Sequence, residues 1–147
     1  MLQIRKAQKE DAESLRELYH CHLAPFSPEQ ELGRWREKLE RFEQDPNYHL
    51  LVGCAQGRIV SSVTLIIIEN LTHDLRPYAI VENVVTHGAY RGRHYASALM
   101  EEASKRAKAA GCYKVMLLTG SKKESTLRFY ENCGFNRFDK TGFIKKL

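Results

Sequence analysis

The feature that most constrains this chain is a short basic turn, Arg91-Gly92-Arg93-His94-Tyr95-Ala96, that joins two regular segments. A run rich in β-branched residues, 80–86, precedes the turn and predicts a strand, and apolar residues at helical spacing follow it. Such a turn presents several backbone N–H groups at the positive end of a helix dipole. This arrangement binds phosphate or pyrophosphate. The chain is therefore expected to bind a nucleotide-containing cofactor.

The rest of the sequence alternates strand and helix patterns, so we expect a mixed sheet with helices on both faces, an α/β (α+β) fold. Ser27-Pro28-Glu29-Gln30 has the pattern of a helix start, and Gly142 interrupts the last strand. Strands are predicted at 2–6, 48–54, 59–68, 78–86, 113–119 and 135–146, and helices at 11–23, 27–44, 96–110 and 124–132. The sheet should therefore have six or seven strands.

Composition narrows the class of protein. The 147 residues suit a single domain, 1–147, and the longest apolar run, 63–68, is far too short to cross a bilayer. Charged residues interrupt the start of the chain, so no signal peptide is expected and the cytoplasm is the expected location. The net charge of +5 is spread without an aromatic-interleaved basic stripe, which suits a small anionic ligand and argues against nucleic acid.

Metal binding is not expected from this sequence. The four cysteines are widely scattered and form no CxxC pair, which favours reduced thiols. His20 and His22 flank Cys21, but two residues apart on a helix point to different sides, so their imidazoles diverge.

Two motifs, in this element order, resemble those of the GNAT acyltransferase superfamily over nearly the whole chain. The turn 91–96 is similar to the family's acetyl-CoA pyrophosphate loop, Arg/Gln-x-x-Gly-x-Gly/Ala. Phe129-Tyr130-Glu131-Asn132-Cys133-Gly134-Phe135 is similar to the family's Phe-Tyr-x-x-x-Gly-Phe signature. The sequence departs from the family at His94, where the loop usually has a glycine, and at Lys123, where an asparagine often contacts the pantetheine arm.

The resemblance implies a GNAT fold and acetyl-CoA as co-substrate. It also places the cofactor along the end of one strand, the basic turn and the first turn of the next helix. The residues expected to bind acetyl-CoA are Val84, Val85, Thr86, Arg91, Gly92, Arg93, His94, Tyr95, Ala96 and Ser97. An N–H near Val84 or Val85 is expected to hold the oxyanion. Lys122, Lys123 and Arg128 are candidates for the 3′-phosphate of the cofactor, with a solvated basic loop as the alternative.

Glu82 and Tyr130 are the catalytic candidates. Amide formation from a thioester needs a neutral amine, and a carboxylate at Glu82 can take the amine proton directly or through water. The departing thiolate needs a proton, which the phenol of Tyr130 can supply because it stays protonated at physiological pH. The alternatives are an outward-facing strand glutamate with a water chain as base, and a core aromatic that packs beside Phe129 and Phe135.

The acceptor is expected to be a small amine that carries an anionic group. The segments Ile80-Val81-Glu82-Asn83-Val84-Val85 and Gly111-Cys112-Tyr113-Lys114 are most similar to glucosamine-6-phosphate N-acetyltransferases, and aminoalkylphosphonate acetyltransferases are comparably similar. Glu82 and Asn83 are therefore assigned to acceptor binding, although the sugar enzymes have Glu-Asp there. The helix pair 11–44 and the loop 70–76 would build the acceptor site.

Several further expectations stay open at this point. Arg76, His73 and Lys145 are candidate anion contacts, with ordinary surface positions as the alternative. A protein N-acetyltransferase and a non-catalytic acyl-CoA sensor are the competing functions. A homodimer is possible because the terminal strand 135–146 can pair or swap across a subunit boundary.

Overall fold

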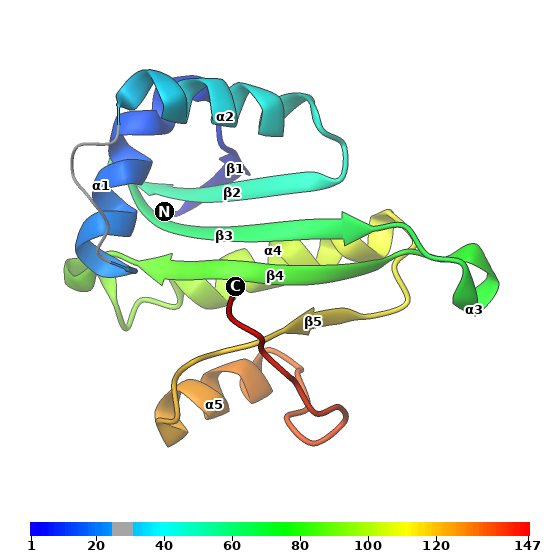
Figure 1. Cartoon of the computed structure of the whole chain (residues 1–147). Coiled ribbons are helices and arrows are strands. Elements are labelled where there is room, and N and C mark those ends of the chain that lie inside the picture. Colours follow the sequence, from blue (N-terminus) through cyan, green and yellow to red (C-terminus); the bar gives the residue numbers. More distant parts are fainter. Residues whose placement is uncertain (25–30) are drawn as a thin grey trace.

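The computed structural model describes residues 1–24 and 31–147, so the predicted helix start at 27–30 lies outside the described residues. The sheet has the strand order β1-β2-β3-β4-β5, in which only the β4–β5 pair is parallel (Figure 1). The strands are β1 (Gln3–Lys6), β2 (Tyr48–Ala55), β3 (Arg58–Ile68), β4 (Tyr78–Thr86) and β5 (Val115–Leu117). The helices are η1 (Lys9–Asp11), α1 (Ala12–His22), α2 (Leu32–Gln44), α3 (Thr72–Leu75), η2 (Gly88–Tyr90), α4 (Tyr95–Ala109) and α5 (Glu124–Asn132).

Helices cover both faces of the sheet, as the patterns predict (Figure 1). On one face α1 and α2 pack against a core that includes Leu15, Leu39 and Val52. On the other face α4 packs through Leu99 and Met100, and partly buried residues of α5 and the segment after it complete that core. Side chains of a strand alternate between faces, which is why the long apolar strand β3 contributes to both cores.

The prediction of six or seven strands is wrong, because the described residues form a five-stranded sheet. The expected strand at 135–146 has no regular structure, and the expected strand at 113–119 is reduced to β5, which has three residues. A strand needs a neighbour for its backbone hydrogen bonds, and so short a β5 gives the terminal segment little to pair with. Its Phe138, Phe143 and Ile144 are exposed.

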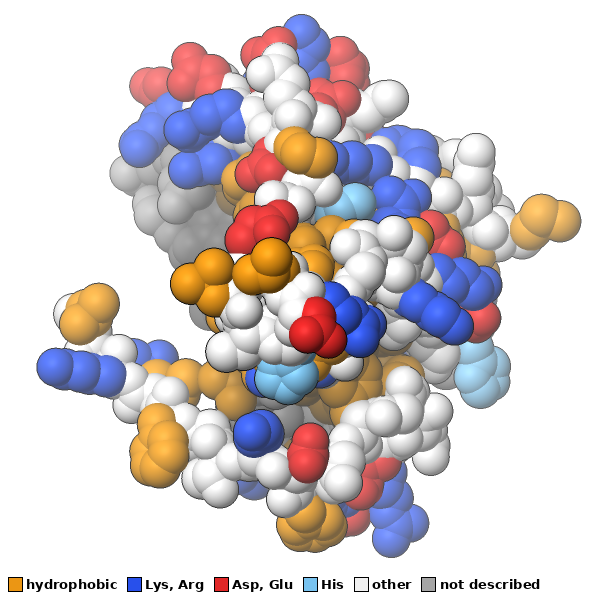
Figure 2. Space-filling model, turned by 90° about the vertical axis from the view of Figure 1, so that its right-hand side faces the viewer, with side chains coloured by type: hydrophobic (Ala, Val, Ile, Leu, Met, Phe, Trp, Pro, Cys, Tyr) orange, Lys and Arg blue, Asp and Glu red, His pale blue; other side chains and the backbone are white. Residues whose placement is uncertain are grey.

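The β3–β4 connection turns in an unusual way at α3. His73, Asp74 and Leu75 all have positive φ, between 54° and 62°, so this turn is left-handed. Leu71 and Leu75 are exposed there, and Figure 2, which faces this end of the molecule, shows hydrophobic side chains at the surface among charged ones.

All four cysteines are free thiols. Among residues 1–24 and 31–147, no three His, Cys, Asp or Glu side chains lie together as metal ligands would. None of the helices in this part of the chain has the length and apolar character needed to span a membrane.

Candidate active site

The basic turn after β4 leads into a helix whose first N–H groups have no side-chain cap. His94 is the N-cap residue of α4 and makes no side-chain cap hydrogen bond, and the first turn contains no acidic residue. Arg91 and Arg93 are exposed beside it, and no ion pair within the described residues engages either one. Uncapped N–H groups, the helix dipole and two guanidinium groups together suit a pyrophosphate.

Contacts within the turn hold it against the end of β4. The Arg91 Nε donates to the Thr86 carbonyl oxygen at 3.3 Å, and the Arg93 guanidinium lies 5.1 Å from the centroid of the Tyr90 ring. Gly92 has φ +75°, and nothing lies within 4 Å of the place where a Cβ would be, so its outer side is open. The turn is therefore ordered by its own side chains while its glycine stays accessible.

His94 takes the left-handed conformation that the family's glycine would provide, with φ +61° and ψ +20°. Histidine visits this region more readily than most residues, at a cost of roughly 1–2 kcal/mol. Its side chain is exposed, so it points away from the core. Tyr95, Ala96 and Ser97, which follow it in the first turn of α4, are half-buried.

Strands β4 and β5 part in the middle of β4, which leaves the second half of β4 without a neighbour on that side. The parallel pairing runs only from Ala79–Val115 to Val81–Leu117, so β4 from Glu82 onward has no β5 partner. On its other side β4 pairs with β3, and the register of this pairing shifts between the pairs Thr64–Glu82 and Ser62–Val85. Backbone groups on this side of the half-strand therefore have no partner in β5, and Figure 1 shows the chain after β5 diverging from β4 toward α5.

Asn83 forms the bulge behind this register shift. Its φ is +53°, a conformation that asparagine tolerates better than most residues. The extra residue places Val84 against the α4-side core and Val85 in the core under α1 and α2. Thr86 ends the strand, and its Oγ1 lies 2.9 Å from the Ser61 Oγ. The assignments of these residues to ligand binding remain predictions.

Glu82 is an exposed carboxylate in the middle of β4, on the α1–α2 side beside the buried Thr64. Exposure at such a place indicates that the surface above Glu82 is open to solvent. Tyr130 lies in α5 across the gap and is half-buried. Burial raises the pKa of the Tyr130 hydroxyl, and the nearby Cys133 thiol and the charge of Glu82 raise it further. The electrostatic effect of Glu82 on Tyr130 is consistent with a shared site, and the assignment of both residues as catalytic stays a prediction.

The Tyr130 ring also packs against other aromatic rings, as expected if Tyr130 is a core aromatic residue. Its ring makes edge contacts with Phe129, at a centroid distance of 5.1 Å, and with Phe135, at 6.4 Å. These contacts fix the ring, and they do not occupy the hydroxyl. A structural role for the ring and a chemical role for the hydroxyl are therefore compatible.

Arg76 and His73, two of the candidate anion contacts, lie at the α3 end of β4 and contact other groups of the protein. Arg76 donates to the carbonyl oxygens of Gly111 and Cys112, and the His73 ring stacks on Tyr113 at a centroid distance of 3.8 Å. Both residues hold α3 against the chain that enters β5, at the opposite end of β4 from the basic turn (Figure 1). The loop 70–76 therefore lies away from the candidate pyrophosphate site. Lys145 is exposed.

The basic residues proposed for the 3′-phosphate lie around the start of α5. Lys122 and Lys123 are exposed, and the Lys123 backbone N–H donates to the Ser121 Oγ at 3.3 Å. The Arg128 Nε lies 3.5 Å from the Glu124 Oε1. Arg128 is therefore paired with a carboxylate in this structure.

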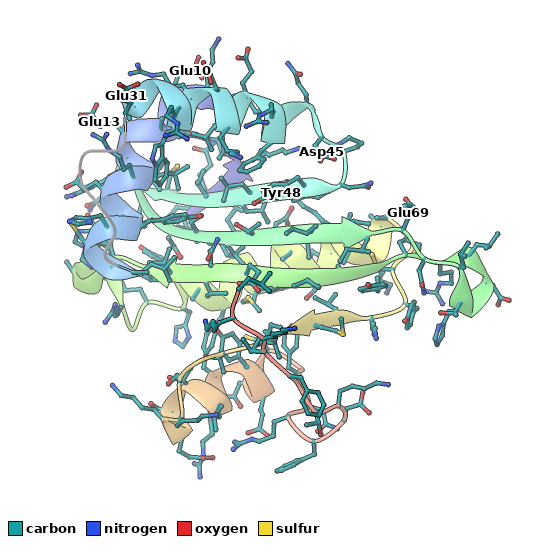
Figure 3. All side chains as sticks on the ribbon, in the orientation of Figure 1. Glu10, Glu13, Glu31, Asp45, Tyr48 and Glu69 are labelled. Atoms are coloured by element: carbon teal, nitrogen blue, oxygen red, sulfur yellow. The ribbon has the colours of Figure 1, made fainter. Side chains whose placement is uncertain are left out.

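Sequence reasoning missed a group of hydroxyls beside Glu82. Tyr19 from α1, Tyr48 from β2 (Figure 3) and Thr64 from β3 meet under the helices on the same face of the sheet as Glu82. The available signal was the polar Ser61-Ser62 pair and Thr64 within an otherwise apolar strand. Two open surface hollows lie elsewhere, one at η1 and α2 and one beside α3, and neither contains Glu82 or Tyr130.

The fold and the turn are like those of α/β proteins that bind a nucleotide pyrophosphate at a helix N-terminus. The sequence profile of the Acetyltransferase (GNAT) family matches residues 13–135. The chain belongs to this family and is therefore an enzyme, an N-acetyltransferase. Enzymes of this family use acetyl-CoA, which suits the uncapped N-terminus of α4 and its two arginines.

Two named enzymes and one solved structure are similar to this chain. Glucosamine 6-phosphate N-acetyltransferase of Trypanosoma brucei brucei is 36% identical over 84 residues, which are 57% of this chain and 55% of that protein. Glucosamine 6-phosphate N-acetyltransferase 1 of Dictyostelium discoideum is 26% identical over 78% of this chain and 70% of that protein. A solved structure from Agrobacterium tumefaciens str. C58, assigned as an acetyltransferase, is 39% identical, covers 99% of both chains and has a TM-score of 0.90. The match thus spans about half the length of the trypanosome relative.

Proposed function

We propose that this enzyme transfers the acetyl group of acetyl-CoA to the primary amine of a small, anionic acceptor such as an amino-sugar phosphate. The transfer is by direct attack in a ternary complex. The observation that carries the proposal is the exposed Glu82 in the middle of β4, where the pairing with β5 ends, together with the half-buried Tyr130 of α5, whose pKa is raised by burial, by Cys133 and by the charge of Glu82. The two relatives named for glucosamine 6-phosphate support the substrate class.

Each residue has a defined task in this proposal. An alkylamine has a pKa of ~10.4, so its deprotonation at pH 7 costs about 4–5 kcal/mol, and Glu82 accepts that proton directly or through water. Backbone N–H groups near Val84 and Val85 hold the negative charge that develops on the carbonyl oxygen. Tyr130 donates its proton to the departing sulfur. Arg91, Arg93 and the first turn of α4 bind the pyrophosphate.

A homodimer and a cytoplasmic location remain part of the proposal. The exposed Phe138, Phe143 and Ile144 of the terminal segment offer an apolar surface to a second copy. Size-exclusion chromatography with light scattering tests the dimer. A monomer at micromolar concentration would contradict it.

The test of the proposed function is release of free CoA thiol from acetyl-CoA in the presence of single amines. The panel includes glucosamine 6-phosphate, aminoalkylphosphonates, aminoglycosides, polyamines, amino acids and short peptides. We expect turnover with a small anionic amine and a loss of about 10²–10⁴-fold in Tyr130→Phe. Tyr113→Phe, which lies at the other end of β4 beside His73, is the matched control.

The outcomes separate the competing functions. Turnover only with peptides would establish a protein acetyltransferase and reject the small acceptor. Stabilisation by acetyl-CoA with no turnover of any amine would indicate an acyl-CoA sensor. Full activity in Tyr130→Phe would keep the enzyme and reject the assigned acid.

A further inference from the structure

Helix α5, which carries Tyr130, buries little of its own surface. The structure describes all of α5, Glu124–Asn132, and none of these residues is buried. The strand before it, β5, has only three residues, and α5 lies below that strand at the edge of the sheet (Figure 1). An element with little buried surface opens or shifts at a low free-energy cost. The position of the Tyr130 hydroxyl therefore depends on contacts other than burial.

The C-terminus of α5 ends in a Schellman motif that supports Tyr130. The Phe135 N–H donates to the Tyr130 carbonyl oxygen at 3.1 Å. The Gly134 N–H donates to the Glu131 carbonyl oxygen at 2.9 Å, and Gly134 has φ +96°, the left-handed conformation that this motif needs. The Phe135 ring thereby packs against the Tyr130 ring, at a centroid distance of 6.4 Å. Because Phe135 also packs against the α4-side core, it connects Tyr130 to the body of the protein.

Arg137 joins the segment after the helix to one face of α5. Its Nη1 and Nη2 donate to the two carboxylate oxygens of Glu124 at 3.3 and 2.9 Å, and Nη2 also donates to the Glu131 Oε1. Glu124 and Glu131 are seven residues apart, so they lie on one face of the helix, two turns from each other. The Phe138 ring lies beside the guanidinium, with its centroid 5.8 Å away. One side chain thus spans most of the length of α5.

The geometry of Arg137 makes this contact more than an ordinary surface ion pair. An isolated exposed pair contributes little, but a bidentate arginine in a network of charges is the exception. The guanidinium is planar and presents its donors in a fixed fork, so its contact with both carboxylates sets the direction of α5 relative to the segment after it. Tyr130 is the neighbour of Glu131 in the chain. A change in the tilt of α5 would therefore move the phenol.

We propose that Arg137 is a positioning residue for the reaction. By binding Glu124 and Glu131 it holds α5 against Phe135 and fixes the Tyr130 hydroxyl where the departing sulfur of CoA needs a proton. This inference rests on the proposed function, in which Tyr130 is the acid. Arg137 acts through Tyr130 and not by binding either substrate, so its removal should lower kcat and leave the binding of acetyl-CoA in place.

The test is a double-mutant cycle on kcat, measured with the best acceptor of the amine panel and well below the melting temperature of every variant. We expect Arg137→Gln to lower kcat about tenfold and to change KM for acetyl-CoA less than about twofold, because a misplaced acid loses part of the about 10²–10⁴-fold that it contributes. In the Tyr130→Phe background the same substitution should lower kcat less than about twofold, because the hydroxyl that Arg137 positions is gone. Arg137→Lys keeps the charge without the fork and should fall between wild type and Arg137→Gln.

Arg5 provides a matched control at the opposite edge of the sheet, in β1. It makes a bidentate contact with Asp11 at 2.7 and 2.8 Å, so Arg5→Gln removes the same kind of interaction away from α5. This variant should lower the melting temperature and leave kcat unchanged. Hydrogen exchange gives a readout besides activity. A peptide that covers 124–138 should exchange faster in Arg137→Gln and at the wild-type rate in Arg5→Gln.

Each outcome of these measurements supports or overturns the inference. Wild-type kcat in Arg137→Gln, an equal loss with and without the Tyr130 hydroxyl, an equal loss in Arg5→Gln, or unchanged exchange over 124–138 overturns it. Turnover by the wild type and a loss in Tyr130→Phe would then leave the proposed function standing. Absence of turnover with every amine overturns the proposed function, and full activity in Tyr130→Phe overturns the assigned acid; the inference falls in both cases.

Discussion

A carboxylate placed at the uncapped N-terminus of α4 should make the protein more stable and weaken its binding of CoA. Ser97 is the third residue of the helix, and the first turn has neither an acidic residue nor a side-chain cap. A carboxylate introduced by Ser97→Asp should favour the helix dipole by about 0.3–1 kcal/mol, which corresponds to about 1–3 °C in melting temperature for a chain of this length. The same carboxylate would repel a pyrophosphate.

The size of that repulsion follows from Coulomb's law. Two negative charges at roughly 5 Å from the new carboxylate, in the dielectric of water, cost about 1.7 kcal/mol, or roughly 15- to 20-fold in Kd at low ionic strength. Thermal unfolding and calorimetric titration with CoA measure the two effects. Ser97→Asn controls for size, and Ser104→Asp places the same charge at an exposed position in the middle of α4. A Ser97→Asp variant that binds CoA as tightly as the wild type would refute the placement of the pyrophosphate.

Three other variants test particular features of the structure. Asn83→Val should destabilise the bulge by about 1–2 kcal/mol because its φ is positive, whereas Asn83→Gly should be tolerated; chemical denaturation compares them. Both ring nitrogens of His49 are buried without a partner in the described residues, and burial lowers the pKa of His49. The wild type should therefore lose stability as the pH falls below about 6.5, and His49→Leu should flatten this loss in melting curves. The Nδ1 atoms of His22 and His87 accept from the Gly88 and Ala89 N–H groups, and burial, with His22 beside it, lowers the pKa of His87. Protonation of His87 removes the acceptor of the Ala89 N–H, so the wild type should lose stability as the pH falls from about 6.5 through that lowered pKa, and His87→Asn, which keeps an acceptor, should show a weaker dependence in melting curves.

Much of the fold could be predicted from local patterns. The limits of β4 and α5 agree with the expected 78–86 and 124–132, because strong strand and helix signals have clear boundaries there. The Gln56-Gly57 turn, with positive φ at both residues, closes the β2–β3 hairpin, and a glycine in so short a connection is a local signal for such a turn. The turn before α4 was also predictable, since its basic residues and glycine stand between two regular segments.

The rest depends on tertiary contacts that no local pattern encodes. The terminal segment 135–146 has a strand-like composition but lacks a long neighbour, since β5 ends at Leu117. The bulge at Asn83 appears only when β4 pairs with β3, because its register shift depends on both strands. The approach of Tyr19 to Thr64 depends on how α1 crosses the sheet. A tyrosine in an apolar helical stripe and a threonine in an apolar strand give no local sign that they meet.

The central claim is that Glu82 and Tyr130 make this GNAT enzyme an acetyltransferase of small amines. The most direct test is release of CoA thiol from acetyl-CoA with glucosamine 6-phosphate as acceptor, in the wild type, Tyr130→Phe and Glu82→Gln. The account predicts turnover by the wild type, a large loss of kcat in both variants, and CoA affinity close to that of the wild type in each. Wild-type kcat in both variants would contradict it.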